Sequence, residues 1–562
     1  MFGDSVDLSA AITEYGRGET RKMDFILNKI TMSTDYNASA KEFFVGCSNF
    51  NGQFPENLAY SLFDLFLISK PWHSFVSDIA ENCLLLLVNI ATQYEQLAQQ
   101  LLSNFCATLF SSSLYSSSSA DADTSEIVFK ALREFLNSLP HFESQFIGCL
   151  ERTLPSWGRP TPQLFTALAN ALRLCYETPQ LLSPSSIQQL LCFCFTLLID
   201  IEVNIEPTIT SSAECPLSKL SLPFDVDHFT KNKQLIFETL SDKSPPATPL
   251  FWLSVMSLSL IFPGGNSELV DQSAKKRRWA FMCAVFRDMR TRFFHRVLPV
   301  QSAFAAYPLL LIYMCSLRPG LVVNFLESLW KFVKDTRQPN EVRVRCLNYL
   351  ADYLARSNHV SNEIIVEQLH DMAAWCVEYT YFRRNRLSSQ FKKMFAEHTL
   401  FYIIFESIVF VLTYRQIEII GTPKYRHSCT FLPLGQLINC PFKPLDRLTS
   451  GLRSHFLAVS FAYKMNWTSS LVPEIPSELD PCPMPSFTCP FSEAAATFPI
   501  TSHLSLLRDF VQSKRTRKRP LENDAASSSN GALEYPSVTN KRINSRTFKP
   551  RHFNFNALAD IT

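Results

Sequence analysis

The sequence predicts an all-α fold made of short helices that pack as antiparallel pairs. Three observations support this fold class. Apolar residues recur with helical spacing along most of the chain, prolines mark short turns between these stretches, and glycine is scarce, with 14 among 562 residues, against a usual share of about 7%. With 46% hydrophobic residues, the chain has enough apolar surface for several domains or one long array of repeats.

The clearest helices lie between residues 307 and 379. Residues 321–333 place apolar side chains at i, i+3, i+4 and i+7, which is typical of a helix with one buried face. The tripeptides Arg318-Pro319-Gly320 and Gln338-Pro339-Asn340 predict turns at its two ends. Further amphipathic stretches at 342–353 and 363–379 complete two helical hairpins.

These hairpins repeat with an offset of roughly 40 residues, which is the period of HEAT and armadillo units. A hairpin of this kind cannot cover its own apolar face, so it must stack on its neighbours. The sequence therefore predicts a HEAT- or armadillo-like helical repeat solenoid, whose long surfaces suit the binding of other macromolecules.

The remaining elements follow from where helical periodicity begins and fails. N-terminal helices are expected at 58–68, 75–110, 127–139, 142–150, 162–176 and 187–203. Prolines among Ser and Thr mark an insert or linker, and a polar, basic C-terminus is typical of disorder. The predicted organisation is a flexible N-terminal segment (1–45), N-terminal helical repeats (46–204), a Pro/Ser-rich insert or linker (205–248), C-terminal helical repeats (249–470), a Pro-rich C-terminal segment (471–511) and a disordered basic tail (512–562).

Two strongly apolar runs, 399–414 and 190–201, could be mistaken for membrane spans. Both are shorter than the roughly 20 residues that a transmembrane helix needs, and Glu406 stands in the middle of the first. The sequence therefore predicts helices buried inside the repeat stack, and no membrane association is expected.

No catalytic or cofactor motif stands out. The patterns GxGxxG, GxxxxGK[ST], GxSxG and HExxH do not occur, so we expect neither enzyme activity nor a cofactor. The 16 cysteines are scattered without a CxxC pair, which favours small buried hydrophobes in a reducing, intracellular compartment. His427, Cys429 and Cys440 come closest to a metal-ligand set, although ordinary loop residues are the favoured interpretation.

A group of residues between 307 and 356 forms a recognisable signature. Its members are Tyr313, Met314, Cys315, Ser316, Phe325, Leu326, Glu327, Ser328, Leu329, Trp330, Arg343, Asn348, Tyr349, Leu354, Ala355 and Arg356. In both order and spacing, this group resembles the central signature of the RNA polymerase I-specific transcription initiation factor family. Each short pattern alone could arise in any helical repeat, whereas their joint occurrence is specific. Near the C-terminus, the stretch from Cys489 to Phe510 resembles a family segment that begins Phe-Pro-Phe-Asp; this chain has Cys489-Pro490-Phe491-Ser492 instead.

The resemblance implies a helical fold and a role in rRNA synthesis and ribosome biogenesis. The protein would bind RNA polymerase I in the nucleolus and bridge it to the promoter-bound core or selectivity factor, with promoter ribosomal DNA as a further partner. Protein kinases would regulate it, and the free protein would have the option of a homodimer. The alternative interpretations are a HEAT-repeat scaffold or nuclear transport adaptor without a transcription role and, with least support, an enzyme whose site is not recognised.

A serine-rich stretch between the N-terminal helices is a candidate site of phosphoregulation or polymerase contact. Each phosphate would add nearly two negative charges, and an acidic residue follows Ser118 at position 121. A plain low-complexity loop is the alternative. The candidate serines are Ser111, Ser112, Ser113, Ser116, Ser117, Ser118 and Ser119.

Three groups of cations are candidates for contacts with other molecules. The first, Lys275 to Arg278, is followed by further arginines on one expected helix, for which a solvated face is favoured over an import signal or acidic-partner contact. Arg415, at the end of an apolar helix, is a candidate DNA contact, with a simple capping charge as the alternative. In the tail, the candidate import signal is Lys514, Arg515, Arg517, Lys518 and Arg519.

Overall fold

The computed structural model of the chain describes residues 8–32, 36–48, 50, 52–110, 119–153, 174–175, 182–204, 254–255, 257–258, 261–262, 272–300, 306–383, 397–471, 485–491 and 507. The chain divides into two units, Met1–Phe510 and Val511–Thr562, and all described residues belong to the first. Every regular element among them is a helix, and the only strand-like feature is an isolated antiparallel bridge between Ser357 and Leu507. The predicted all-α fold class is therefore confirmed.

The N-terminal helices are short and closely spaced. A π-helical turn, η1, continues α4, and two 3₁₀ turns, η2 and η4, lead into α5 and α8. The elements are α1 (Leu8–Gly16), α2 (Arg21–Met32), α3 (Tyr36–Ser48), α4 (Glu56–Asp64), η1 (Leu65–Ser69), η2 (Trp72–Ser74), α5 (Ser77–Gln93), α6 (Glu95–Phe110), α7 (Ser119–Ser138), η4 (Pro140–Phe142) and α8 (Glu143–Thr153).

Two features of this region differ from the sequence prediction. Residues 1–45 were expected to be flexible, but α1, α2 and most of α3 lie there, because Met23, Ile26 and Ile30 line one face of α2 and are buried. The expected single helix at 75–110 is two helices, since Tyr94 adopts an extended conformation at φ −135° and ψ 107° between α5 and α6.

The C-terminal helices include both predicted hairpins. Pro319 begins α15 and Pro339 directly precedes α16, so both predicted turns lie where the prolines indicated. The elements are α10 (Pro184–Asn204), α13 (Gln272–Arg292), η6 (Phe293–Val297), α14 (Ala306–Ser316), α15 (Pro319–Lys334), α16 (Asn340–Arg356), α17 (Asn362–Arg383), α19 (Thr399–Tyr414), α20 (Gln416–Ile419), α21 (Pro423–Thr430), α22 (Leu434–Ile438), η8 (Pro444–Arg447), α23 (Ser450–Ala462) and η9 (Asn466–Ser470).

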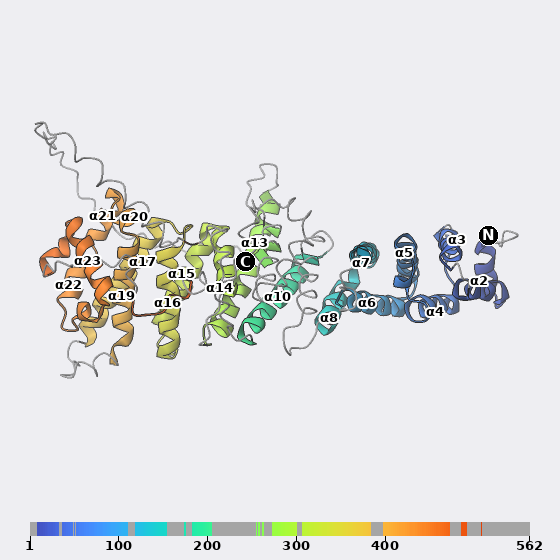
Figure 1. Cartoon of the computed structure of the whole chain (residues 1–562), viewed down its shortest axis with the longest axis horizontal. Coiled ribbons are helices and arrows are strands. Elements are labelled where there is room, and N and C mark those ends of the chain that lie inside the picture. The colour runs from blue at the N-terminus through green and yellow to red at the C-terminus, as the bar shows by residue number, and fades with distance from the viewer. Residues whose placement is uncertain are drawn as a thin grey trace, which may run out of the picture. The chain divides into compact units, whose positions relative to one another are not determined.

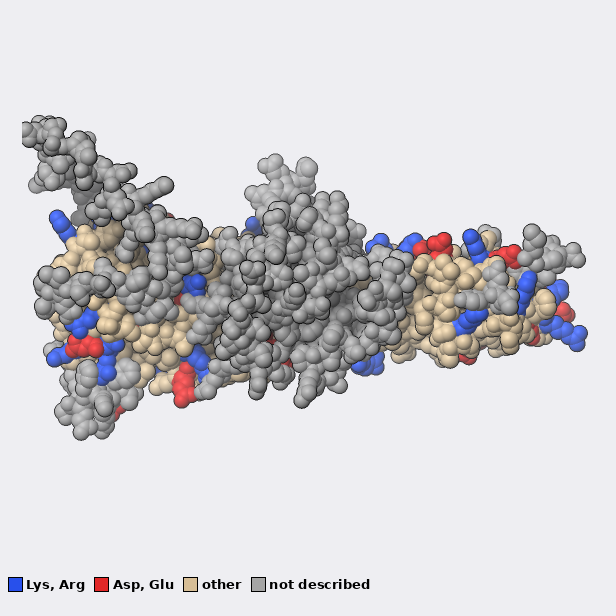
Figure 2. Space-filling view, viewed as in Figure 1, with Lys and Arg blue, Asp and Glu red and all other residues tan. Residues whose placement is uncertain are grey.

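Helices pack mainly on those that are nearest to them in the sequence. Figure 1 shows this succession, in which α5 lies against α6 and α7, α10 against α8 and α13, and α16 against α15 and α19. Each layer therefore buries its apolar stripe against the layers before and after it, as a helical repeat array does. On the face shown in Figure 2, the Lys and Arg side chains of the described residues are interspersed with Asp and Glu.

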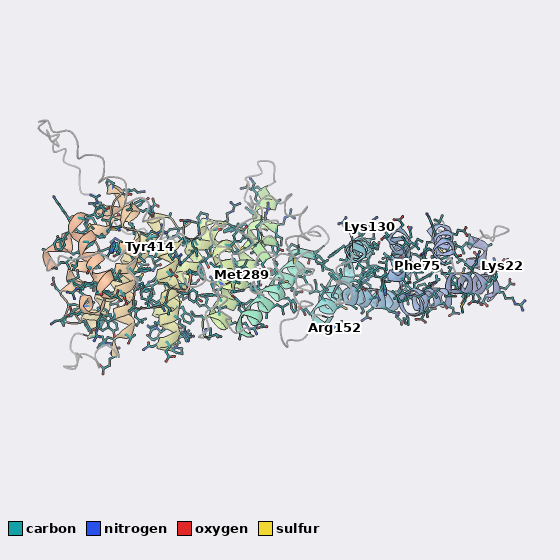
Figure 3. All side chains as sticks on the ribbon, in the orientation of Figure 1. Lys22, Phe75, Lys130, Arg152, Met289 and Tyr414 are labelled. Carbon is teal, nitrogen blue, oxygen red and sulfur yellow. The ribbon has the colours of Figure 1, made fainter. Side chains whose placement is uncertain are left out.

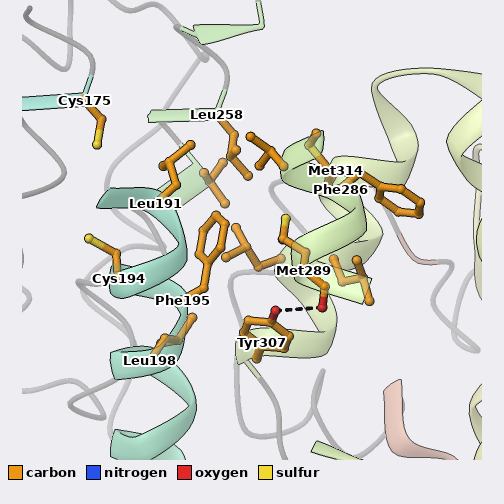
Figure 4. Close-up of a cluster of buried hydrophobic side chains, with 14 of the residues drawn as sticks. Cys175, Leu191, Cys194, Phe195, Leu198, Leu258, Phe286, Met289, Tyr307 and Met314 are labelled. Atoms are coloured by element: carbon orange, nitrogen blue, oxygen red, sulfur yellow. Dashed lines mark hydrogen bonds between the residues drawn. The ribbon is translucent and has the colours of Figure 1, made fainter. Parts of the chain in front are cut away.

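The apolar side chains form one core cluster that extends from α1 to the described C-terminal residues. Figure 4 shows the part where α10, α13 and α14 meet, with Phe195 and Leu198 facing Met289 and Tyr307. The Tyr307 hydroxyl donates a hydrogen bond of 2.9 Å to the Met289 carbonyl oxygen. This contact satisfies the polar end of a fully buried aromatic ring.

The apolar helix α19 lies inside the stack, as its composition predicted. Every residue from 400 to 413 is buried. Within the described part of the chain, no helix is long and apolar enough to cross a membrane.

Candidate functional site

The family-like signature lies on α14, α15 and α16, and most of its side chains are buried. Phe325 contacts Phe293 and Tyr353 edge to face, at ring-centroid distances of 5.7 Å in both cases. Trp330 is 4% exposed. The apolar signature residues therefore hold three helices together and do not present a surface to a partner. The buried members are Met314, Cys315, Phe325, Leu326, Leu329, Trp330, Arg343, Asn348, Tyr349, Leu354, Ala355 and Arg356, while Tyr313, Ser316 and Ser328 are partly exposed and Glu327 is exposed.

Arg343 joins the two helices of one hairpin. Its Nε donates to the carbonyl oxygen of Val333 at 2.8 Å, and Nη1 donates to Asn340 Oδ1 at 3.0 Å. Val333 lies in the last turn of α15, where carbonyl groups lack partners within the helix. Arg343 thus satisfies the end of α15 from the first turn of α16.

Arg415 makes the corresponding connection between α19 and α16. Its Nε donates to the Leu354 carbonyl oxygen at 3.1 Å, its Nη2 donates to the Ser357 carbonyl oxygen, and its Nη1 pairs with Glu418 at 2.8 Å. Burial lowers the pKa of Arg415 to about 10, so the guanidinium stays charged at neutral pH.

The structure does not place Arg415 where the predicted DNA contact requires it. The whole residue is 2% exposed, and its donors are directed at the carbonyl end of a neighbouring helix. The capping alternative is closer to what is seen, although the helix that is capped is α16 and not its own. Figure 3 labels the preceding residue, Tyr414, within the packed side chains of this region.

A polar stripe runs along the buried face of α16. Asn348, Asp352 and Arg356 are four residues apart and are 5%, 0% and 4% exposed. Asn348 Nδ2 donates to Thr488 Oγ1 at 3.0 Å, and Asp352 Oδ2 accepts the backbone N–H of Phe491 at 2.7 Å. Two members of this stripe therefore bind the C-terminal segment.

A second buried acid binds the same segment from α19. Glu406 is 4% exposed and accepts the backbone N–H of Ser486 at 2.7 Å and the Ser486 hydroxyl. Burial raises the pKa of Glu406, and the two hydrogen bonds from Ser486 oppose the rise. An isolated charge inside an otherwise apolar run was the signal in the sequence for this site, because buried acids need partners.

The cation group predicted from the sequence at Lys275 to Arg278 lies at the start of α13. Lys275, Lys276 and Arg277 are exposed. Two arginines further along the helix are engaged: Arg290 with Asn324 and Ser328, and Arg292 with Thr196. The exposed cations of α13 are thus Lys275, Lys276 and Arg277 in its first turns and Arg287 further along.

Several predicted sites lie outside the described residues. These are Ser111 to Ser118 of the serine-rich stretch and the candidate import signal at 514–519. Ser119 is the first residue of α7, so the helix begins inside the predicted loop.

The weak metal candidate is not supported. Cys429 is buried and His427 lies edge to face against Phe431. Among the described residues no group of His, Cys, Asp or Glu side chains could hold a metal ion.

Comparison with known proteins gives a consistent result. Residues 254–475 match the sequence model of the family described as RNA polymerase I specific transcription initiation factor RRN3. The RNA polymerase I-specific transcription initiation factor RRN3 of Mus musculus is 22% identical over 186 residues, which are 32% of this chain and 27% of that protein. The matched region thus spans about a quarter of the mouse relative.

A solved structure supports the fold over a longer stretch. The crystal structure of RNA polymerase I transcription initiation factor Rrn3 superposes with a TM-score of 0.53 at 13% identity, and covers 82% of this chain and 86% of that chain. The matched range spans the positions of the signature residues named above. Over residues 254–475, the chain is thus similar to the RRN3 family of RNA polymerase I-specific transcription initiation factors.

Proposed function

We propose that this chain is a transcription initiation factor that binds RNA polymerase I and helps it to start rRNA synthesis in the nucleolus. The observation that carries the proposal is the family match over residues 254–475, which includes the charged residues that join α15, α16 and α19.

The mechanism that we propose is recruitment. A stack of packed helices can present two separate surfaces, and binding polymerase on one and the promoter-bound core factor on the other raises the effective concentration of polymerase at the promoter. Phosphorylation in the serine-rich stretch 111–119 would change the charge of one surface. Each of these finer steps is part of the proposal.

We propose that an exposed apolar surface on the N-terminal helices binds polymerase. Phe25, Met32 and Ile68 are 65%, 83% and 66% exposed. Lys70, two residues after Ile68, donates to the carbonyl oxygen of Ile30, two residues before Met32, so the ends of α2 and η1 lie side by side. Exposed apolar groups of this kind are typical of interfaces.

A capture experiment tests the proposal. Immobilised full-length chain is incubated with nuclear extract, and RNA polymerases I, II and III are quantified by mass spectrometry. We expect polymerase I to be enriched over the other two, and depletion of the chain from cells to lower precursor rRNA. Equal recovery of all three polymerases, together with unchanged precursor rRNA, would point to the scaffold or transport alternative.

A pair of matched variants locates the surface. We expect the double variant Phe25→Ser, Ile68→Ser to capture several-fold less polymerase I, whereas Phe431→Ser, which changes an aromatic side chain that is 67% exposed in the C-terminal half, should capture as much as the parent. The reverse result would move polymerase binding to the C-terminal helices.

A further inference from the structure

The segment from Pro485 to Phe491 lies against α16 and α19 with alternating burial. Pro485, Cys489 and Phe491 are buried and Phe487 is partly buried, whereas Ser486 and Thr488 are exposed. Alternate residues facing inward are typical of a peptide that lies on a surface. We call residues 485–491 the C-terminal latch.

The latch is held through its backbone by two buried carboxylates from different helices. Glu406 of α19 accepts the N–H of Ser486, and Asp352 of α16 accepts the N–H of Phe491, both at 2.7 Å. Hydrogen bonds to ionised acceptors are about twice as strong as those between neutral groups. Because the two carboxylates bind specific N–H groups near both ends of the latch, they fix its register on the two helices.

Aromatic contacts add side-chain specificity at the inward positions. The Phe487 ring lies 5.8 Å from Phe410 of α19, and the Phe491 ring lies 5.5 Å from Tyr349 and 6.1 Å from Tyr353 of α16. Backbone hydrogen bonds combined with pockets for alternate side chains are a common mode of peptide recognition.

We propose that α16 and α19 form a peptide-binding surface, and that the C-terminal latch is its reversible occupant in the same chain. The two helices pack directly on one another, so the pair does not depend on the latch for its own contact. The latch is joined to Leu471 by residues 472–484, which include four prolines and reach at most about 45 Å when extended.

Tethering through residues 472–484 favours the state in which the latch is docked on α16 and α19, but does not make that state permanent. A short linker keeps the effective concentration of a tethered peptide near the millimolar range. If the latch binds α16 and α19 with ordinary micromolar affinity, it would then be docked most of the time and released for a measurable fraction of the time. The inference does not depend on the proposed function, because it concerns contacts inside the chain.

Hydrogen exchange on the full-length protein tests whether the latch is docked as described. We expect the amides of Ser486 and Phe491 to be protected. In Asp352→Asn, both amides should exchange at least tenfold faster, while the central amides of α16 and α19 keep their rates. In Ser486→Pro, which has no amide at position 486, the Phe491 amide should show the same acceleration. If protection of the latch is lost only together with that of the two helices, the latch is a fixed part of the core and the proposal is wrong.

Binding of a synthetic peptide tests reversibility. A fluorescent peptide of residues 484–492 is titrated into the full-length Phe491→Ala and Ser486→Pro variants, each of which weakens the latch in its own chain. We expect micromolar binding to at least one variant, at least tenfold weaker binding to the parent, and none of the peptide that carries Phe491→Ala. Equal binding to parent and variants, or no binding to either variant, would overturn the proposal.

Phe431→Ala serves as the matched control, because it also removes an aromatic ring but from an exposed position. It should bind the peptide as weakly as the parent does. Circular dichroism of each variant keeps a folding defect distinguishable from an open latch.

Discussion

The N-terminal helices α1 to α8 and the C-terminal helices α14 to α23 both pack as successive helices, but their buried side chains differ in polarity. Among the described side chains, the buried polar residue of α1 to α8 is Ser39, and those between α8 and α14 are Ser186, Ser254 and Ser257. From 343 onward, buried groups include Arg343, Asp352, Arg356, Glu406 and Arg415. One region is packed almost entirely by apolar side chains, and the other also carries buried charges.

This difference offers a physical reason why the match to the family sequence model is confined to residues 254–475. Apolar cores accept many substitutions of similar volume, so an N-terminal half packed in this way keeps its fold while its sequence changes. A buried charge needs a particular partner at a particular distance. All five buried charges lie within residues 254–475, the part of the chain that matches the RRN3 family.

The largest effect is expected at Arg415. Replacing it with Ala leaves the buried carbonyl groups of Leu354 and Ser357 without their donor and opens a cavity between α16 and α19. We expect a loss of about 3–5 kcal/mol in the free energy of unfolding, measured by urea denaturation. Arg415→Lys should recover only part of the loss, because Lys lacks the planar fork.

The control for Arg415 is an exposed arginine. Arg277→Ala, on the exposed first turns of α13, should change the free energy of unfolding by less than about 0.5 kcal/mol. Similar losses in Arg415→Ala and Arg277→Ala would mean that buried charges do not stabilise the C-terminal helices as described.

An intermediate effect that depends on pH is expected at Glu406. Burial raises its pKa above the ordinary 4.5, so the folded state binds the proton more tightly than the unfolded state. Stability from this group is therefore complete below pH 4.5 and declines as pH rises through the higher folded value. Glu406→Gln removes this titration, so its deficit in Tm relative to the parent should be smaller at pH 7.5 than at pH 5.

Thermal unfolding of parent and variant across this pH range measures the difference. Since other groups titrate equally in both proteins, the comparison isolates Glu406. A deficit that grows from pH 5 to pH 7.5 would show that hydrogen bonds from Ser486 outweigh the cost of burying the carboxylate.

Some helices could be predicted from the sequence and others could not. Helices α15, α16 and α17 were located closely, because periodicity and Pro319 and Pro339 act over a few residues. The helix α2 was missed since its three buried positions lie among Arg21, Lys22 and Lys29, which make the segment look polar.

The site was less predictable than the fold because its contacts are distant in sequence. Arg415 reaches Leu354, 61 residues away, and Asp352 reaches Phe491, 139 residues away. Local sequence pattern does not identify such a partner. The sequence therefore indicates only a DNA contact or a capping charge for Arg415, and only a Pro-rich segment for 485–491. The family resemblance marked Asn348 and Arg343 without indicating what they bind.

A smaller effect is expected for a conservative change in the apolar half. Leu101 of α6 is fully buried, and Leu101→Met keeps its volume nearly unchanged. We expect a loss of less than about 1.5 kcal/mol in the free energy of unfolding, below that of Arg415→Lys. A larger loss than Arg415→Lys would contradict the view that the N-terminal helices tolerate sequence change more readily.

The smallest effect is expected at a surface cluster that links α17 to α21. Glu363 accepts hydrogen bonds from Lys424 at 2.7 Å and Tyr425 at 2.6 Å, and these lower the pKa of Glu363 to about 2. The stabilisation is present above the ordinary pKa of 4.5 and is lost as pH falls toward 2. Its side chain is 53% exposed, so solvent and salt screen the interaction. Glu363→Gln should therefore lower Tm at pH 7 by about 1 °C or less, and the difference should vanish in 1 M NaCl. A loss as large as that of Arg415→Lys would mean that exposed charges stabilise the fold as much as buried ones.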